Sequence, residues 1–447
     1  DFKAIADAGC NTFFQWDRYT ATNAGQHLAV AKRHGLEGVS LLETGWPRYK
    51  DADLKTPGQL LAPHEAARIC ADSRMGDLQL RGHLVRSKAS AQEKAAVYAE
   101  YYGKSVSAAE RMIASVRDND NFLAYNSFDE PFDDSLFKTT NILGALFQLT
   151  RRVDGYHPVM LNYSSHIPAG DQYVTCCDIL CTDPYWVPDG DPSWGVRATP
   201  NFVSKIVAWT DRRAAKFRKA VWTIPLGWTW GGCRKRGLNA LEQDCQCFLA
   251  IIHGSKGFFW FCYPMPETGW NNLKATIAKV KIIGPMAVQP KVAQRVRHSR
   301  ATEPATMYVE APFIPEKDAY PDVQGRVFRA PNGGFVLLAA NSQYYPVIAT
   351  FTIEGLSGKV ARIFADAELA VRDGVFGETL EPFAVRAYRL GARLQEPVVL
   401  SIAALRPAVV PPAVTSFRHN VRTDRKNVFP NPSFEEETIP GLADYYM

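Results

Sequence analysis

Short apolar runs alternate with longer amphipathic stretches from residue 1 to about residue 290. The apolar runs have the length of strands and end in polar or aromatic residues, whereas the amphipathic stretches repeat their apolar positions at helical spacing. The predicted strands are Asn11–Trp16, Gly38–Leu42, Phe122–Phe128, Pro158–Tyr163, Asp178–Thr182, Val221–Pro225 and Gly257–Tyr263. The predicted helices between them include Gly25–His34, Ala91–Val116, Phe137–Val153, Phe202–Phe217 and Leu241–His253.

This alternation predicts a parallel sheet, because a connection that contains a helix returns the chain to the same edge of the sheet. The first residues, DFKAIADAG, are typical of the end of a helix with Gly9 as its stop. We therefore predict an α/β fold, a (β/α)₈ barrel over residues 1–295, with its first strand upstream of Asp1. In this numbering Phe122–Phe128 is the fourth strand and Val221–Pro225 the seventh. The long connection 44–90 lacks a regular pattern, and such connections are commonly functional.

The pattern changes after the barrel. Residues 300–391 carry short alternating strands separated by turn residues, which predicts a small antiparallel β-sandwich domain. Residues 392–428 are rich in proline and are predicted to be a linker. The tail 429–447, with its FPNPSFEEE segment, resembles the beginning of a carbohydrate-binding module, so we expect both ends of the chain to be truncated.

Composition narrows the function classes. The net charge of +5 is spread without a basic block, so no nucleic-acid partner is predicted. No apolar run reaches the length of about 18 residues that a membrane helix needs, so no membrane partner is predicted. The nine cysteines show no zinc-type spacing, so neither a metal nor another cofactor is predicted. We expect buried thiols at Cys176, Cys177, Cys181 and Cys262, and leave open a disulfide among Cys233, Cys245 and Cys247.

Aromatic residues are enriched at 12% of the chain, including ten Trp. Several of them lie near predicted strand ends. Gathered at one barrel mouth, they would form a platform on which sugar rings stack. For any single tryptophan, packing in the core is an equal alternative. The tryptophans in question are Trp16, Trp46, Trp186, Trp228 and Trp230.

The segment FLAYNSFDEP carries the strongest chemical signal, since an apolar strand leads directly into Asp129 and Glu130. The carboxyl ends of barrel strands build the active site, so carboxylates at this position point into the mouth. Cleavage of a glycosidic bond needs a proton donor for the leaving oxygen and a second group at the sugar carbon. The alternative is that one of the two acids caps the following helix.

Residues 1 to about 290 resemble the retaining glycoside hydrolases of the clan-A type, in which a Glu at the end of the fourth strand is the acid/base. Glu130 matches that position. The seventh strand, AVWTIPLGWTWGG, lacks the nucleophilic carboxylate of that clan. The Asp-Glu-Pro motif resembles that of the substrate-assisted β-N-acetylhexosaminidases and galactosaminidases, which implies Glu130 as general acid/base and Asp129 as the group that orients a 2-acetamido substituent.

CTDPYW, at the end of the sixth strand, contributes the third predicted catalytic residue, Asp183, although Asp-Pro also favours a plain turn. Asp183 or Glu267 would be the second carboxylate if the enzyme does not use substrate assistance. The residues predicted to bind substrate are Trp16, Asp17, Glu43, Trp46, Asn162, Tyr163, Tyr185, Trp186, Trp228, Trp230, Tyr263 and Glu267.

Together these features predict a secreted or periplasmic glycoside hydrolase whose partner is an oligo- or polysaccharide substrate. One alternative is a hydrolase of a neutral glycan with Asp183 or Glu267 as its second carboxylate. The other is a barrel that binds glycans without cleaving them, because a missing nucleophile is also typical of a degenerate enzyme. The oligomeric state is left open.

Overall fold

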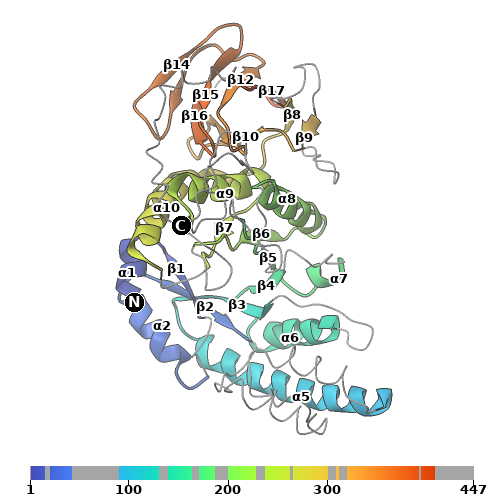
Figure 1. The fold of residues 1–447 in the computed structure, drawn as a ribbon. Coiled ribbons are helices and arrows are strands. Elements are labelled where there is room, and N and C mark those ends of the chain that lie inside the picture. The colour runs from blue at the N-terminus through green and yellow to red at the C-terminus, as the bar shows by residue number, and fades with distance from the viewer. Residues whose placement is uncertain are drawn as a thin grey trace, which may run out of the picture. The chain divides into compact units, whose positions relative to one another are not determined.

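The fold was analysed in a computed structural model (Figure 1). It describes residues 2–15, 21–42, 90–129, 139–163, 171–186, 200–227, 237–261, 265–300, 309–311, 320–391 and 394–407. The chain divides into two compact units. The first comprises Asp1–Tyr185, Ile206–Leu226 and Gly254–Tyr263. The second comprises Trp186–Lys205, Gly227–His253 and Pro264–Met447.

The first unit is built on a sheet of seven parallel strands that follow one another in chain order, each paired with its successor. All seven predicted strands are present, and the predicted parallel α/β arrangement is confirmed. Within the described residues β1 and β7 are the edges of this sheet, so the eighth strand and the closure of a barrel stay predictions. The strands are β1 Thr12–Gln15, β2 Glu37–Leu41, β3 Phe122–Asp129, β4 Val159–Tyr163, β5 Ile179–Thr182, β6 Ala220–Thr223 and β7 Gly257–Phe258.

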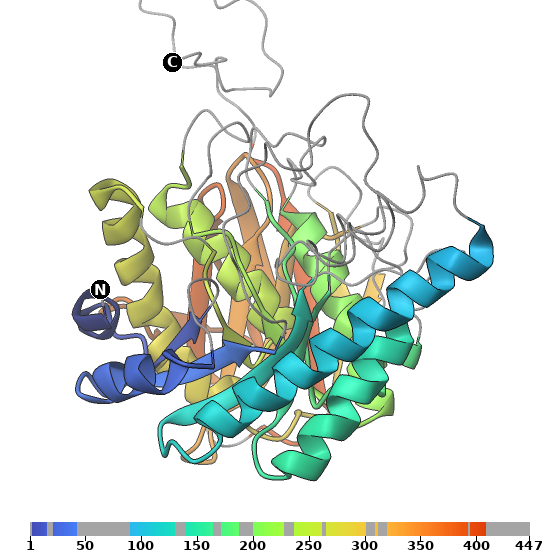
Figure 2. The same ribbon diagram turned by 90° about the horizontal axis from the view of Figure 1, so that it is seen from below.

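Helices connect successive strands, and all five predicted helices are present with small shifts at their ends. Gly9 follows the first helix with a φ of 90°, a conformation that favours glycine and ends the helix as predicted. Ser90 opens α5 through a capping box with Glu93, and α5 and α6 run side by side (Figure 2). The helices are α1 Phe2–Asp7, α2 Ala24–Lys32, α5 Ala91–Val116, α6 Thr139–Val153, α7 Asp171–Val174, α8 Asn201–Lys216, α9 Ala240–His253 and α10 Glu267–Ala287.

The two faces of the parallel sheet carry different side chains. On the outer face, Phe13, Phe122 and Tyr125 pack with apolar residues of α2, α5 and α6. Gly38 also faces this side, and glycine suits the position because an added Cβ would lie 2.3 Å from Cδ2 of Leu28 on α2. The inner face carries a separate apolar cluster, whose buried members are Val39, Ala124, Met160, Ile179, Cys181, Ile224 and Phe259.

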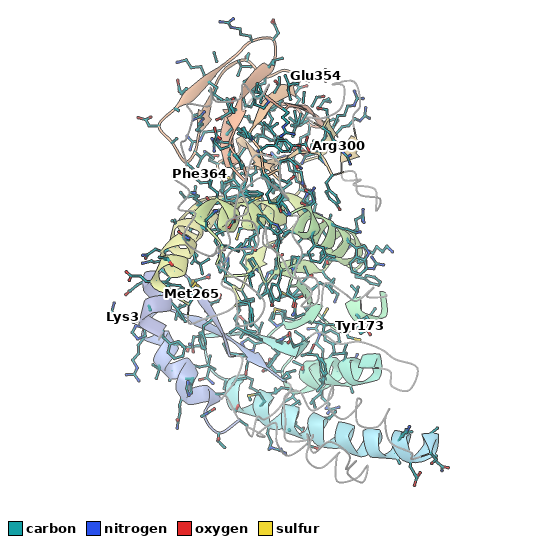
Figure 3. All side chains as sticks on the ribbon, viewed as in Figure 1. Lys3, Tyr173, Met265, Arg300, Glu354 and Phe364 are labelled. Carbon is teal, nitrogen blue, oxygen red and sulfur yellow. The ribbon has the colours of Figure 1, made fainter. Side chains whose placement is uncertain are left out.

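The second unit holds two sheets of five strands each, in which most neighbouring strands are antiparallel. Their strand orders are β10-β11-β16-β13-β14 and β15-β12-β17-β8-β9. One apolar cluster contains residues of both sheets, among them Leu337 and Phe351, so the sheets share a core. Phe364, labelled in Figure 3, packs edge to face on Phe248 of α9 with ring centroids 5.6 Å apart. The strands are β8 Gln294–His298, β9 Val309–Ala311, β10 Val323–Arg329, β11 Phe335–Asn341, β12 Val347–Ile353, β13 Gly358–Arg362, β14 Glu368–Val371, β15 Val375–Leu380, β16 Val385–Gly391 and β17 Val398–Leu405.

The predicted boundaries around these sheets need a correction. β17 falls inside the range 392–428 predicted as a linker, yet it pairs with β12 on one side and β8 on the other. Val398, Leu400, Ile402 and Ala404 alternate inward along it, a strand pattern that the neighbouring prolines obscured. β8 likewise belongs to the sheet although it overlaps the end of the predicted barrel segment. The tail 408–447 lies outside the described residues.

Candidate active site

Three polar side chains meet on the inner face of the parallel sheet, at the carboxyl ends of β3, β4 and β5. Asp129 is the last residue of β3, Asn162 lies near the end of β4, and Asp183 follows β5 directly. The Nδ2 atom of Asn162 donates hydrogen bonds to Oδ1 of Asp129 at 2.9 Å and to Oδ2 of Asp183 at 3.3 Å. We refer to these three residues as the carboxylate cluster.

Strand register explains why the three side chains share one face. Met160 and Cys181 belong to the inner apolar cluster, and side chains two residues further along a strand return to the same face. Asn162 and Asp183 therefore point inward. Between Asn126 and Asp129 the pairing of β3 with β4 shifts by one residue, so Asp129 stands opposite Asn162. This irregularity brings the Asp129 carboxylate to the inner face.

The shared donor also limits how far apart the carboxylates lie. An Asn amide offers two N–H bonds at about 120° to each other, so oxygens bonded to one each are about 5 Å apart. Retaining glycosidases hold their two carboxyl groups at about 5 to 5.5 Å, and inverting enzymes at about 6.5 to 9.5 Å. Asn162 and Asp183 are 1% and 3% exposed, whereas Asp129 is half-buried.

Cys181 lies below the cluster and stands opposite Asn162 in the register of β4 and β5. Burial raises the pKa of its thiol well above the usual range, and the negative charges of Asp183 and Asp129 act in the same direction. The thiol is therefore neutral and is not a nucleophile. Cys176 and Cys177 are also buried thiols, as predicted, whereas Cys262 lies outside the described residues. Cys245 and Cys247 are buried and form no disulfide.

The other predicted site residues in the described part of the chain are spread more widely. Tyr185 is half-buried and stacks on Phe261 with ring centroids 5.6 Å apart. Trp186 is fully buried with its ring edge to face against Phe383, which is the core-packing alternative for that tryptophan. Tyr163 ends β4, and Glu267 is an exposed first residue of α10, where an acid is favoured by the helix dipole.

Several predicted site residues lie outside the described residues, including the predicted acid Glu130. Their roles stay predictions. The others are Trp16, Asp17, Glu43, Trp46, Trp228, Trp230 and Tyr263.

The described residues contain no group of three or more His, Cys, Asp or Glu side chains that could hold a metal ion. None of their helices is long and apolar enough to cross a membrane.

Comparison with known proteins gives structural likenesses only. No protein-family model and no curated protein matches the sequence. The β-galactosidase of Marinomonas ef1 is 9% identical, with 66% of this chain and 60% of that chain covered and a TM-score of 0.45. The α-amylase of Anoxybacillus is 8% identical, with 88% and 89% covered and a TM-score of 0.49. The α-galactosidase I of Mortierella vinacea is 11% identical, with 87% and 90% covered and a TM-score of 0.48.

The present chain thus spans 60% of the length of the Marinomonas protein. Because all three TM-scores are below 0.5, the fold assignment rests on the strand order, and the function is inferred from the carboxylate cluster.

Two features of the site were not predicted from the sequence. One is the place of Asn162 between the two carboxylates, which depends on the shifted register of β3. The other is the neutral Cys181 beneath them. The position of Cys181 could have been read from the sequence. It precedes Asp183 by two residues, so the two side chains share one face of the strand.

Proposed function

We propose that the chain is a glycoside hydrolase acting on an oligo- or polysaccharide, with its reaction centre at the carboxyl ends of β3 and β5. The observation that carries this proposal is the pair of inward carboxylates, Asp129 and Asp183, held by one amide. Paired acids at about this separation are what glycosidic cleavage needs. In parallel α/β sheets this edge is also where ligands bind.

In the first version of the mechanism, Glu130 protonates the leaving oxygen and Asp129 orients the 2-acetamido group of the substrate. That group attacks the anomeric carbon as the glycosidic bond breaks, and water later opens the ring intermediate and returns a proton to Glu130. The inward position of Asp129 and its hydrogen bond from Asn162 support this role, since the amide favours the ionised form that an acetamido N–H would bind.

A second version is favoured by the shared amide itself, and it acts on a neutral glycan. One carboxylate of the cluster attacks the anomeric carbon while the glycosidic C–O bond breaks. The leaving oxygen takes a proton from a second carboxyl group, that of the predicted acid Glu130. Water then displaces the ester and gives its proton to that second group. Asp183 is the candidate nucleophile here. Glu267 is a weaker candidate for the second carboxylate, because it is exposed and begins a helix.

Three substitutions test these versions on a panel of 4-nitrophenyl glycosides with and without a 2-acetamido group. Glu130→Gln removes the acid of the first version and is expected to lower kcat/KM by about 10² to 10⁴-fold. Asp129→Asn is expected to be severe on acetamido substrates if Asp129 orients that group. Recovery of an Asp183→Ala variant by azide, with a glycosyl azide as product, would support the second version.

The same experiment tests the proposal as a whole. If the unaltered chain binds glycans in an isothermal titration but hydrolyses no member of the panel, the proposed hydrolase is wrong and a glycan-binding barrel takes its place. Glu130→Gln would then leave the affinity for those glycans largely unchanged.

A further inference from the structure

Asn162 was predicted to bind substrate, but its side chain already has other partners. Its Nδ2 atom donates to both carboxylates. The opposite orientation of the amide is unfavourable, because the carboxylate oxygens would repel the amide oxygen. The side chain is 1% exposed. Its Oδ1 atom is closed off from solvent and has no hydrogen-bond partner among the described residues, so a sugar hydroxyl does not reach it in this structure.

We propose that Asn162 is a positioning residue, which acts on the reaction through Asp129 and Asp183 and not by touching the sugar. The inference rests on the proposed hydrolase function and adds to it the residue that fixes the geometry of the acids. Two carboxylates at about 5 Å repel each other. The amide restrains both side chains against this repulsion by binding one oxygen of each.

The register of the sheet supports this role over a purely space-filling one. Asn162 stands opposite Asp129 on one side and opposite Cys181 on the other. It therefore occupies the central strand of the three that carry the cluster. The neutral thiol of Cys181 offers the carboxylates no charge partner. Nδ2 of Asn162 donates to one oxygen of each acid, so a single side chain joins the ends of the two outer strands of the three.

Asn162→Ala is the first test, and it is expected to lower kcat about 100-fold while KM changes by no more than a few-fold, since displaced catalytic groups lose rate before they lose affinity. Asn162→Asp is the sharper variant. It keeps the shape but removes both donors and adds a third carboxylate, so we expect its kcat to fall below that of Asn162→Ala. A space-filling role predicts the opposite order of the two variants.

Asn121 provides a matched control at the other end of the sheet. It is also buried, and its Nδ2 atom donates to the carbonyl oxygens of Leu28 at 2.8 Å and Leu36 at 3.1 Å. Asn121→Ala removes the same number of hydrogen bonds far from the carboxylates. We expect it to unfold at a lower urea concentration and to keep the kcat of the unaltered chain in its folded fraction.

A second measurement is independent of any substrate. In protein labelled with ¹³C at the Asp carboxyl carbons, the signals of Asp129 and Asp183 are assigned by Asp129→Asn and Asp183→Asn. Both signals should shift in Asn162→Ala and stay in place in Asn121→Ala. Unmoved signals would overturn the positioning role, as would a raised KM with an unchanged kcat. If the chain hydrolyses nothing, only the proposed function fails, and the spectra still decide whether Asn162 holds the pair.

Discussion

Two polar clusters lie on opposite faces of the parallel sheet, an inner one at the carboxyl ends of β3, β4 and β5 and an outer one formed by β3 and the turn between α6 and β4. On the inner face, Asp129 and Asp183 share a single amide donor. On the outer face, Asp154 alone receives several donors. Its Oδ2 accepts from the Tyr125 hydroxyl at 2.6 Å and from Nδ1 of His157 at 2.7 Å, and its Oδ1 accepts from the backbone N–H groups of Tyr156 and His157.

The protonation behaviour of the outer cluster follows from this surplus of donors. Burial pushes the pKa of Asp154 up, but the hydrogen bonds from Tyr125, His157 and the backbone outweigh it, so the pKa is lowered overall. Burial raises the pKa of the Tyr125 hydroxyl, and its hydrogen bond to Asp154 adds to that rise. The outer cluster is thus a hydrogen-bonded network around the Asp154 carboxylate.

The two clusters differ in how acids and donors are matched. Asp154 receives four hydrogen bonds, from Tyr125, His157 and the backbone, and so links the end of α6 to the start of β4. Asp129 and Asp183 instead receive hydrogen bonds from the same amide, that of Asn162. Under the proposed function the inner cluster serves chemistry, because it lies at the carboxyl ends of the strands, and the outer cluster serves stability.

The largest effect is expected from Asp183→Asn in the carboxylate cluster. We predict that kcat/KM falls by about 10² to 10⁴-fold, because under the proposed function Asp183 is one of the two groups that handle the proton or the sugar carbon. The free energy of unfolding should not decrease, since the substitution removes one of two like charges. Steady-state kinetics measure the change in kcat/KM, and urea unfolding measures the change in the free energy of unfolding. A loss of stability without a loss of rate would mean that the inner cluster stabilises the fold and does not take part in the reaction.

Asp154→Ala should have the opposite profile. It leaves the buried Tyr125 hydroxyl and His157 ring without their acceptor, and we expect a loss of about 3 kcal/mol in the free energy of unfolding. The folded fraction should keep its kcat. Urea denaturation followed by fluorescence gives the first number, and kinetics at low urea give the second.

Tyr125→Phe is a milder version of the same test. It deletes one hydroxyl and leaves Asp154 with its remaining donors, so the expected loss is about 1 kcal/mol. A loss as large as that of Asp154→Ala would mean that the hydroxyl, and not the carboxylate, organises the outer cluster. The comparison needs both variants in the same denaturant series.

The smallest effect is a dependence on pH. Because the pKa of Asp154 is lower in the folded chain than in the unfolded one, its contribution to stability is present above about pH 4 and is lost as the pH falls through the folded value. We expect the free energy of unfolding to decline less steeply with acid in Asp154→Asn than in the unaltered chain. Urea unfolding between about pH 5 and pH 3 measures both slopes, and parallel slopes would contradict this role.

Much of the framework was predictable because it depends on local pattern. The strands that carry the cluster were placed to within a few residues from apolar runs that end in polar side chains, and the extent of α5 was predicted from its helical periodicity. Asp129 and Asp183 were found because acids that follow parallel strands gather at one edge of the sheet. β17 was missed because the prolines that flank it, Pro397 and Pro407, are typical of a linker, and because its pairing with β8 joins segments far apart in the chain.

The sequence by itself therefore determined which segments are strands, that they lie parallel, and that carboxylates gather at their ends. Periodicity and residue type decide these features, and both are local. Only the tertiary structure decided that Asp129 turns inward, that Asn162 joins it to Asp183, and that Trp186 is buried against Phe383. Each of these depends on a register shift or on packing between distant segments, because a displacement of one residue moves a side chain to the other face of a sheet.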